Sequence, residues 1–233
     1  MSPPPRPLDQ LWDALNQSSK TLEQDDIALL QEALTHTSSG LNPHHEQLEF
    51  LGDAVLRLAA SEFIATAYPN MPVGDRSSLR AQLVSDRWLS ELGSNIEIER
   101  WWSIGPKASG DATAAATIRA ELSEALIGAL YKVNGLTAVH QWLTPQWQSS
   151  AEAVLADPHR GNCKSALQEW SQGEGLGLPN YTSEEISQRH GDPRRFRCSV
   201  TLPPQLAAEG WGRSRREAEQ QAARAALDQL TDS

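Results

Sequence analysis

The most informative segment of the sequence is HEQLEFLGDAVLR, residues 45–57, which combines acidic and apolar residues at helical spacing. On a helix, at about 100° per residue, Glu46, Glu49, Asp53 and Arg57 fall within a stripe about 80° wide. Leucine, alanine and valine cover most of the remaining circumference. The pattern therefore predicts a largely buried helix that carries three carboxylates along one narrow strip.

A second segment repeats this arrangement. The sequence ELSEALIGAL, residues 121–130, places Glu121 and Glu124 on one helix face and apolar residues on the others. If the two strips face each other, four or five carboxylates converge, and such a cluster must bind cations or raise its pKa values. Oxygen ligands without His or Cys suit hard ions such as Mg²⁺ or Mn²⁺.

These acidic strips allow two other interpretations. The first is that both strips are solvated helix faces. The second is a ferritin-like di-iron site, which needs a Glu-x-x-His on two helices. Neither strip carries that motif, and His44 and His45 are out of register with the first strip. We therefore set the di-iron site aside.

Helical periodicity extends to about Ala156, and the pattern changes after Gly161. The first part predicts helices over residues 8–16, 25–35, 44–68, 75–92, 114–133 and 138–155. The second predicts a helix over 164–172, strands over 181–188, 196–202 and 206–212, and a helix over 215–230. We expect a disordered tail at residues 1–7, an all-α domain at 8–156, a linker at 157–160 and a small α+β domain, ordered α-β-β-β-α, at 161–231.

Charge is divided unevenly between the two parts. The 233 residues carry a net charge of −10. Residues 1–159 hold 10 basic and 20 acidic side chains, whereas residues 160–233 hold 10 of each. An asymmetry of this size indicates two domains with different roles.

Composition excludes several classes of protein. The chain is 39% hydrophobic and 21% charged, as is ordinary for a globular protein. Its best apolar stretch, residues 54–68, is interrupted by Arg57 and Glu62, so we expect no membrane segment. The proline-rich start lacks the apolar core of a secretory signal, and Cys163 and Cys198 form neither a disulfide framework nor a zinc motif. We therefore expect a reducing, cytoplasmic location.

The C-terminal part offers a candidate anion-binding helix. Ser214 is a suitable N-cap, and Glu217 three residues later would complete a capping box. Arg215 and Arg216 then lie in the first turn, beside free backbone N–H groups and the positive end of the helix dipole, which suits phosphates. A second basic group surrounds the first predicted hairpin turn, and its members are Arg189, His190, Arg194 and Arg195. Solubility alone would explain that second group.

Together these segments resemble the ribonuclease III family over nearly the whole chain. Residues 45–53 (HEQLEFLGD) are similar to the family's NERLEFLGD-type signature, and its shorter motifs have counterparts in residues 33–38 (ALTHTS), 79–85 (LRAQLVS) and 124–129 (EALIGA). Residues 161–231 resemble a double-stranded-RNA-binding domain. The resemblance implies the helical ribonuclease III fold and an endonuclease that cuts double-stranded RNA as a homodimer. It also implies Mg²⁺-dependent hydrolysis, with Mn²⁺ as a substitute and no small-molecule cofactor, leaving 5′-phosphate and 3′-hydroxyl ends.

The family's site residues carry over by position. The implied metal ligands are Glu49, Asp53, Glu121 and Glu124. Asp53 and Glu124 would be central to catalysis, and Glu46 falls on a further acidic position near the scissile strands. In the second domain, the residues implied to touch RNA are Gln168, Glu169 and His190 in the minor groove and Arg215 and Arg216 on phosphates across the intervening groove.

The resemblance also implies a cellular role, the processing of ribosomal RNA precursors and structured messages. The alternative is a non-cleaving member of the same fold, either a duplex-RNA-binding or a ribosome-associated protein. Such a protein would be expected to lose carboxylates from the cluster. All of them are acids here, which favours the enzyme.

This sequence departs from the family pattern at a few positions. Glu121 stands where the family usually has Asp, and Gln47 and Thr37 stand where Arg is usual. The loop at residues 105–116 lacks the family's Gly/Arg-rich stretch. Gly52, unfavourable inside a helix, indicates a close approach of two backbones, either at a dimer interface formed by the signature helix or inside its own subunit.

Overall fold

The computed structural model describes residues 7–15, 23–106, 108, 112–156, 162–189, 192–203 and 206–231. The chain forms two compact units, Met1–Ala153 and Val154–Ser233. No helix within the described ranges is both long enough and apolar enough to cross a membrane.

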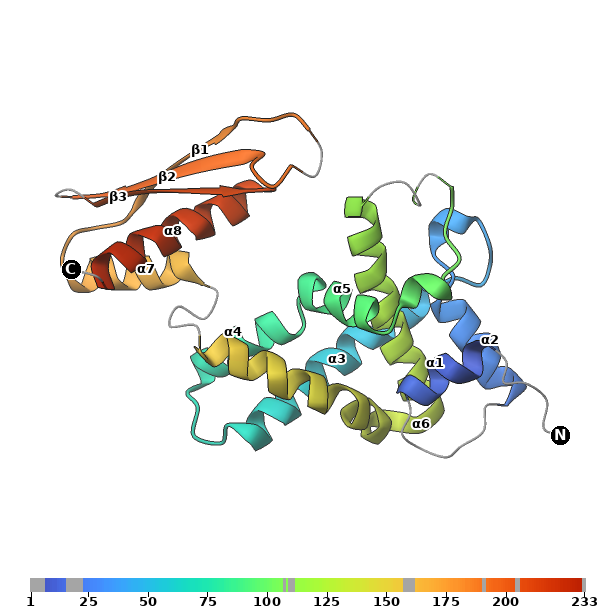
Figure 1. Ribbon diagram of the computed structural model, residues 1–233. Coiled ribbons are helices and arrows are strands. Elements are labelled where there is room, and N and C mark those ends of the chain that lie inside the picture. Colours follow the sequence, from blue (N-terminus) through green and yellow to red (C-terminus); the bar gives the residue numbers. More distant parts are fainter. Residues whose placement is uncertain are drawn as a thin grey trace. The chain divides into compact units, whose positions relative to one another are not determined.

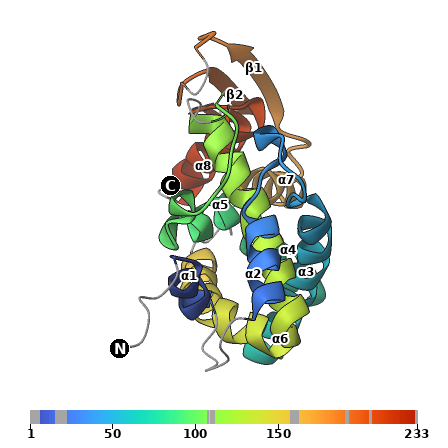
Figure 2. The same cartoon turned by 90° about the vertical axis from the view of Figure 1, so that its right-hand side faces the viewer.

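The first unit is helical (Figures 1 and 2), as the sequence predicts. Its elements are α1 (Pro7–Leu15), α2 (Gln24–Ala33), η1 (Thr37–Ser39), α3 (Glu46–Ala67), α4 (Val73–Leu83), α5 (Asp86–Asn95), η2 (Ile98–Arg100) and α6 (Ala112–Ala156). The two helices predicted over 114–133 and 138–155 form the one long element α6, which is interrupted at Gly135 by non-helical backbone with φ 73°. Glycine tolerates this left-handed conformation because it has no Cβ.

The single helix predicted over residues 75–92 is wrong, because the chain forms α4 and α5 there. Val84 leaves the helical conformation with φ −120°, and Ser85 is extended with ψ 151°. The Ser85 hydroxyl then accepts a hydrogen bond from the backbone N–H of Trp88 and caps α5. This break brings Asp86 to the first position of a new helix.

The core of the first unit surrounds α3 and α6. Leu48, Leu56 and Ile64 of α3 and Leu122 and Leu126 of α6 are almost completely buried. In the second half of α6, the ring of Trp147 stacks 6.0 Å from that of Trp88. Its indole N–H donates to the carbonyl of Leu83 at 3.1 Å, so the buried polar atom is satisfied.

Two glycines set the distance between α3 and α6. A Cβ on Gly52 would overlap the backbone carbonyl of Glu124, and a Cβ on Gly128 would overlap that of Leu48. The helices therefore touch backbone to backbone at a point where any side chain would force them apart. Of the two explanations for Gly52, the close approach inside its own subunit is correct. The explanation that Gly52 itself serves a dimer interface is wrong, because α6 of the same chain occupies the space beside it.

The second unit has the predicted α-β-β-β-α order. It consists of α7 (Cys163–Gly173), β1 (Asn180–Glu185), β2 (Phe196–Leu202), β3 (Leu206–Gly212) and α8 (Arg215–Thr231). The strands form an antiparallel sheet in the order β1-β2-β3, and α7 and α8 lie on one face of it (Figure 1). The core between these layers contains the buried thiols of Cys163 and Cys198.

Candidate active site

The predicted acidic residues meet in one open cleft of about 630 Å³ in the first unit. Its lining residues are His36, Thr37, His45, Glu46, Glu49, Phe50, Asp53, Arg57, Asp86, Glu121 and Glu124. All five acids singled out in this part of the sequence are among them. The two strips therefore face each other, and neither is an ordinary solvated helix face.

The contact between the two glycines explains this convergence. Gly52 lies between Glu49 and Asp53 on α3, and its backbone touches α6 at Glu124. Acids that flank the crossing point on one helix thus come close to acids that flank it on the other. The side chains of Glu49 and Glu121 remain 31% exposed and that of Asp53 42%, so the carboxylates are accessible from solvent.

The carboxylates of this cleft repel one another. Burial, reinforced by the negative charges of Asp53 and Glu49, raises the pKa of Glu124 to about 7. Burial also raises the pKa of Glu49, with Glu121 as the next largest cause. One basic side chain offsets part of this charge, since Nε of Arg57 donates to Oδ1 of Asp53 at 2.8 Å. A cation bound among these oxygens would relieve the remaining repulsion.

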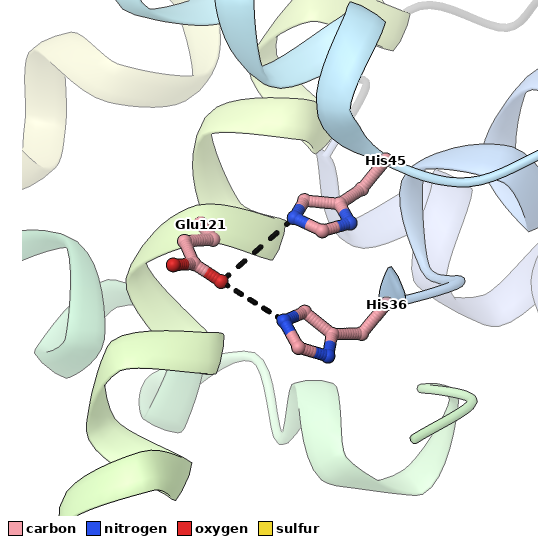
Figure 3. Close-up of side chains that lie close together, drawn as sticks. All are labelled: His36, His45 and Glu121. Carbon is pink, nitrogen blue, oxygen red and sulfur yellow. Dashed lines mark hydrogen bonds and ion pairs between the residues drawn. The ribbon is translucent and has the colours of Figure 1, made fainter. Parts of the chain in front are cut away.

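Two histidines reach the acids, as Figure 3 shows. Nε2 of His36 lies 3.1 Å and Nε2 of His45 3.8 Å from the same oxygen, Oε2 of Glu121. His45 Nε2 also lies 3.1 Å from Oε2 of Glu49. The expectation that His45 is out of register with the acidic strip is wrong. His45 is the N-cap residue of α3 and already has helical backbone angles, φ −59° and ψ −27°. It lies four residues before Glu49, so its side chain shares a helix face with that acid.

Sequence reasoning also missed Asp86. Asp86 lines the cleft. The continuous helix predicted over residues 75–92 placed it in a helix interior, where nothing marked it as a site residue. The available signal was Ser85-Asp86, a hydroxyl residue followed by an acid, which is typical of a helix start. His36 belongs to the short motif at residues 33–38, but that motif does not indicate where its side chain lies. Only the folded chain places His36 in the cleft.

The predicted RNA contacts of the second unit lie at the surface of α7 and α8. Gln168 and Glu169 are exposed on α7, and Arg215 and Arg216 are exposed in the first turn of α8. Residue His190 lies outside the described residues. The backbone N–H of Glu217 donates to Oγ of Ser214 at 3.2 Å, so the predicted N-cap is present.

The second half of the capping box differs from the prediction. The carboxylate of Glu217 accepts a hydrogen bond from the backbone N–H of Arg213 at 2.8 Å, one residue earlier than in the standard box. The hydrogen bond still anchors the start of α8. The arginines that follow Ser214 are thus held at a fixed helix N-terminus.

Comparisons with known proteins identify both units. A family model described as "Ribonuclease-III-like" matches residues 26–147, and the "Double-stranded RNA binding motif" model matches residues 163–230. "Ribonuclease 3" of Prochlorococcus marinus is 55% identical over 207 residues, which cover 88% of this chain and 83% of the relative. "Ribonuclease 3" of Vibrio campbellii is 34% identical over 97% of this chain and 98% of its own.

Solved structures agree with these matches. The nuclease domain of ribonuclease III from Campylobacter jejuni has a TM-score of 0.54 and 27% identity, and the alignment covers 62% of this chain and 96% of that domain. A second structure of that domain has a TM-score of 0.52 and 28% identity, and the alignment covers 59% of this chain and 96% of that one. It is described as showing structural flexibility in a region involved in dimer formation.

Proposed function

Because the chain belongs to the ribonuclease III family and is a double-stranded-RNA endoribonuclease, we propose that it hydrolyses RNA with Mg²⁺ held by Glu49, Asp53, Glu121 and Glu124. The products would be 5′-phosphate and 3′-hydroxyl ends. The observation that carries this proposal is the convergence of these four carboxylates in one cleft, where the pKa of Glu124 is raised to about 7.

The donor set fits a hard divalent ion. The family is one of divalent-metal-dependent nucleases, and four carboxylates offer the oxygen ligands that Mg²⁺ prefers. When bound, the metal would stabilise the negative charge that develops on the phosphate and on the leaving oxygen. The chain's own residues position the ligands: His36 contacts Glu121, His45 contacts Glu49 and Arg57 holds Asp53.

The first test is the cleavage of a long RNA duplex with and without divalent metal. We expect cutting in Mg²⁺ or Mn²⁺, none in EDTA, and recovery when Mg²⁺ is restored. A duplex DNA of the same length is the control and should stay intact. Undiminished cutting in EDTA would contradict the metal-dependent mechanism.

We propose that α7 and α8 form the RNA-binding face of the second unit, with Gln168 and Glu169 at the minor groove and Arg215 and Arg216 on phosphates. His190 belongs to this proposal from its place in the sequence. The exposed arginines at a helix N-terminus support it, because both their charge and the free N–H groups of the helix attract phosphate. Double-stranded RNA is recognised mainly through such backbone contacts and its 2′-hydroxyls.

Replacing both Arg215 and Arg216 by alanine should therefore weaken duplex-RNA binding. The slope of log affinity against log salt concentration should become shallower by about two. The measurement is the affinity of the full chain for duplex RNA in EDTA at several salt concentrations. Arg224→Ala, a change further along α8, is the matched control. An unchanged salt slope in the double variant would place the phosphate contacts elsewhere.

We propose that the nuclease is a homodimer, because a staggered cut of two strands needs two clusters related by a two-fold axis. The side chain of Phe50 supports this. It is 84% exposed at the cleft. Exposure of a large aromatic side chain to water is unfavourable, and burial against a partner surface would remove that cost. Glu46, 62% exposed, would then stand near the scissile strands.

The full chain should consequently have about twice its monomer mass of 25.6 kDa in light scattering. Phe50→Asp should shift it towards the monomer, since a charge would be buried at the interface. Leu178→Asp is the control, because Leu178 is also an exposed apolar residue, at 64%, and belongs to the second unit. A Phe50→Asp variant that stays dimeric would remove Phe50 from the interface.

The remaining parts of the proposal concern organisation and cellular role. We propose domain limits of 8–156 and 161–231 with a linker at 157–160, which the two family matches support. We propose that the enzyme acts in the cytoplasm on ribosomal RNA precursors and structured messages. A non-cleaving RNA-binding protein would have no use for an intact cluster of acids, so the observed cleft favours the nuclease.

A further inference from the structure

We propose that His36, His45 and Glu121 form a second cation site, suited to borderline ions such as Zn²⁺, and that an ion bound there inhibits the nuclease. The inhibition would arise because Glu121 belongs to both sites. This inference rests on the proposed Mg²⁺-dependent cleavage, but the ligand set and the class of ion are different.

The geometry of the three side chains carries the proposal. One ligand atom from each residue lies within 4.8 Å of the other two, and both Nε2 atoms approach the same oxygen of Glu121 at 3.1 and 3.8 Å. The residues come from three separate places in the chain: the segment before η1, the residue before α3, and α6 (Figure 3). Their convergence is a property of the fold and does not follow from one helix face.

Both imidazoles are held with Nε2 towards the cleft. The side chain of His45 is only 3% exposed, and its backbone N–H donates to the carbonyl of Thr35 at 2.9 Å. His36 is fixed by a backbone hydrogen bond to Ser103 at 2.9 Å, and its Nδ1 lies 2.7 Å from Oγ of Ser38. For His36 this polar partner on the second ring nitrogen is the feature that orients histidines in metal sites. Nδ1 of His45 is buried without a hydrogen-bond partner, so burial alone holds that ring.

The chemistry of the donors decides the class of ion. Two neutral imidazoles and one carboxylate suit Zn²⁺, Co²⁺ or Ni²⁺, whereas Mg²⁺ prefers oxygen ligands alone. Glu49, 3.1 Å from His45 Nε2, offers a fourth donor. Tetrahedral Zn²⁺ with bonds of about 2.0–2.1 Å places its ligand atoms about 3.3 Å apart. We expect the Glu121 side chain, which is 31% exposed, to move when the triad closes to that spacing.

Sharing Glu121 couples the two sites. A carboxylate committed to an ion between His36 and His45 is withdrawn from the oxygens that would hold Mg²⁺. A Zn²⁺ ion in the triad therefore lowers cleavage without occupying the RNA-binding face. The coupling is reciprocal, because saturating Mg²⁺ must weaken Zn²⁺ binding by the same factor.

The binding experiment uses the full chain and two probes, Zn²⁺ in equilibrium dialysis and Co²⁺ followed by its visible absorption. His36→Gln and His45→Gln should each weaken the tightest Zn²⁺ binding at least tenfold and change the Co²⁺ spectrum. His140→Gln is the matched control, because His140 also pairs with a carboxylate, Glu62 at 2.7 Å, outside the cleft. It should leave both readouts unchanged.

The activity experiment titrates Zn²⁺ at fixed Mg²⁺, and each variant is compared with its own zinc-free rate. The wild-type chain and His140→Gln should be inhibited at the same Zn²⁺ concentration, and His36→Gln should need at least ten times more. Wild-type protein that binds Zn²⁺ through the histidines but never cuts duplex RNA would contradict the proposed function and leave the ion site standing.

Two outcomes would overturn the inference itself. One is equal Zn²⁺ affinity in the wild-type, His36→Gln and His45→Gln proteins. The other is Zn²⁺ binding that Asp53→Asn abolishes while both histidine variants retain it, which would place the ion in the acidic strip. If His45→Gln fails to fold by circular dichroism, His36→Gln decides alone, since that side chain is 15% exposed.

Glu121→Asp, one methylene shorter, should also lose the tight Zn²⁺ binding.

Discussion

Glu124→Gln should abolish duplex-RNA cleavage, with the single-turnover rate falling by about a thousandfold or more. The amide keeps the shape of the side chain but loses the negative charge that a divalent ion requires. In the proposed mechanism, catalysis depends on charge stabilisation at the phosphate. Duplex affinity, measured in EDTA, should change less than about twofold, because the proposed RNA contacts lie on α7 and α8.

The matched control for this substitution is Glu152→Gln, which makes the same chemical change at an exposed position of α6 outside the cleft. It should leave the cleavage rate unaltered. A Glu124→Gln enzyme that cuts at the wild-type rate would remove Glu124 from the catalytic cluster.

The same substitution has a second expected effect, on stability without metal. The pKa of Glu124 is raised to about 7 in the folded chain, from an ordinary value of 4.5. The folded state therefore retains a proton that the unfolded state loses, so this group's stabilising contribution is complete below pH 4.5 and is lost as the pH rises through 7. After solvent screening we expect a loss of about 2 kcal/mol from the free energy of unfolding.

Glu124→Gln removes this titration. In EDTA at pH 8 the variant should be more stable than the wild-type protein, and at pH 4.5 the difference should be much smaller. Thermal or urea unfolding at the two pH values checks the sign. Parallel pH profiles for variant and wild type would show that Glu124 ionises normally.

Gly52→Ala should destabilise the first unit by about 3 kcal/mol, because a single methyl group cannot be placed between α3 and α6 without separating the helices. The added Cβ would overlap the backbone carbonyl of Glu124. Any protein that still folds should cleave RNA poorly, since the same separation moves Glu49 and Asp53 away from the acids of α6.

Gly74→Ala is the control for this prediction. Gly74 lies in the first turn of α4, and a Cβ there meets nothing within 4 Å. Alanine should leave stability unchanged or raise it by up to about 1 kcal/mol through its better helix propensity. Urea denaturation compares the two variants. Equal stabilities for Gly52→Ala and Gly74→Ala would contradict the backbone contact between α3 and α6.

Most of the elements, and the acids of the cleft other than Asp86, are predictable because they follow from local periodicity. The break between α4 and α5 is the exception. The 3.6-residue repeat assigns Glu46, Glu49 and Asp53 to one side of α3 whatever surrounds that helix. The alternating pattern and the turn residues between strands likewise placed β2 and β3 at residues 196–202 and 206–212. Ser214 marked the start of α8 because capping is a hydrogen bond between near neighbours.

Other features depend on contacts between distant parts of the chain, and no local pattern carries that information. The facing of the two acidic strips requires Gly52 and Gly128 to meet, 76 positions apart in the numbering. His36 and His45 reach Glu121 only because the segments around them pack beside α6. Periodicity fixes the angle of a side chain around its own helix, whereas the distance between two helices is set by how closely their backbones can pack.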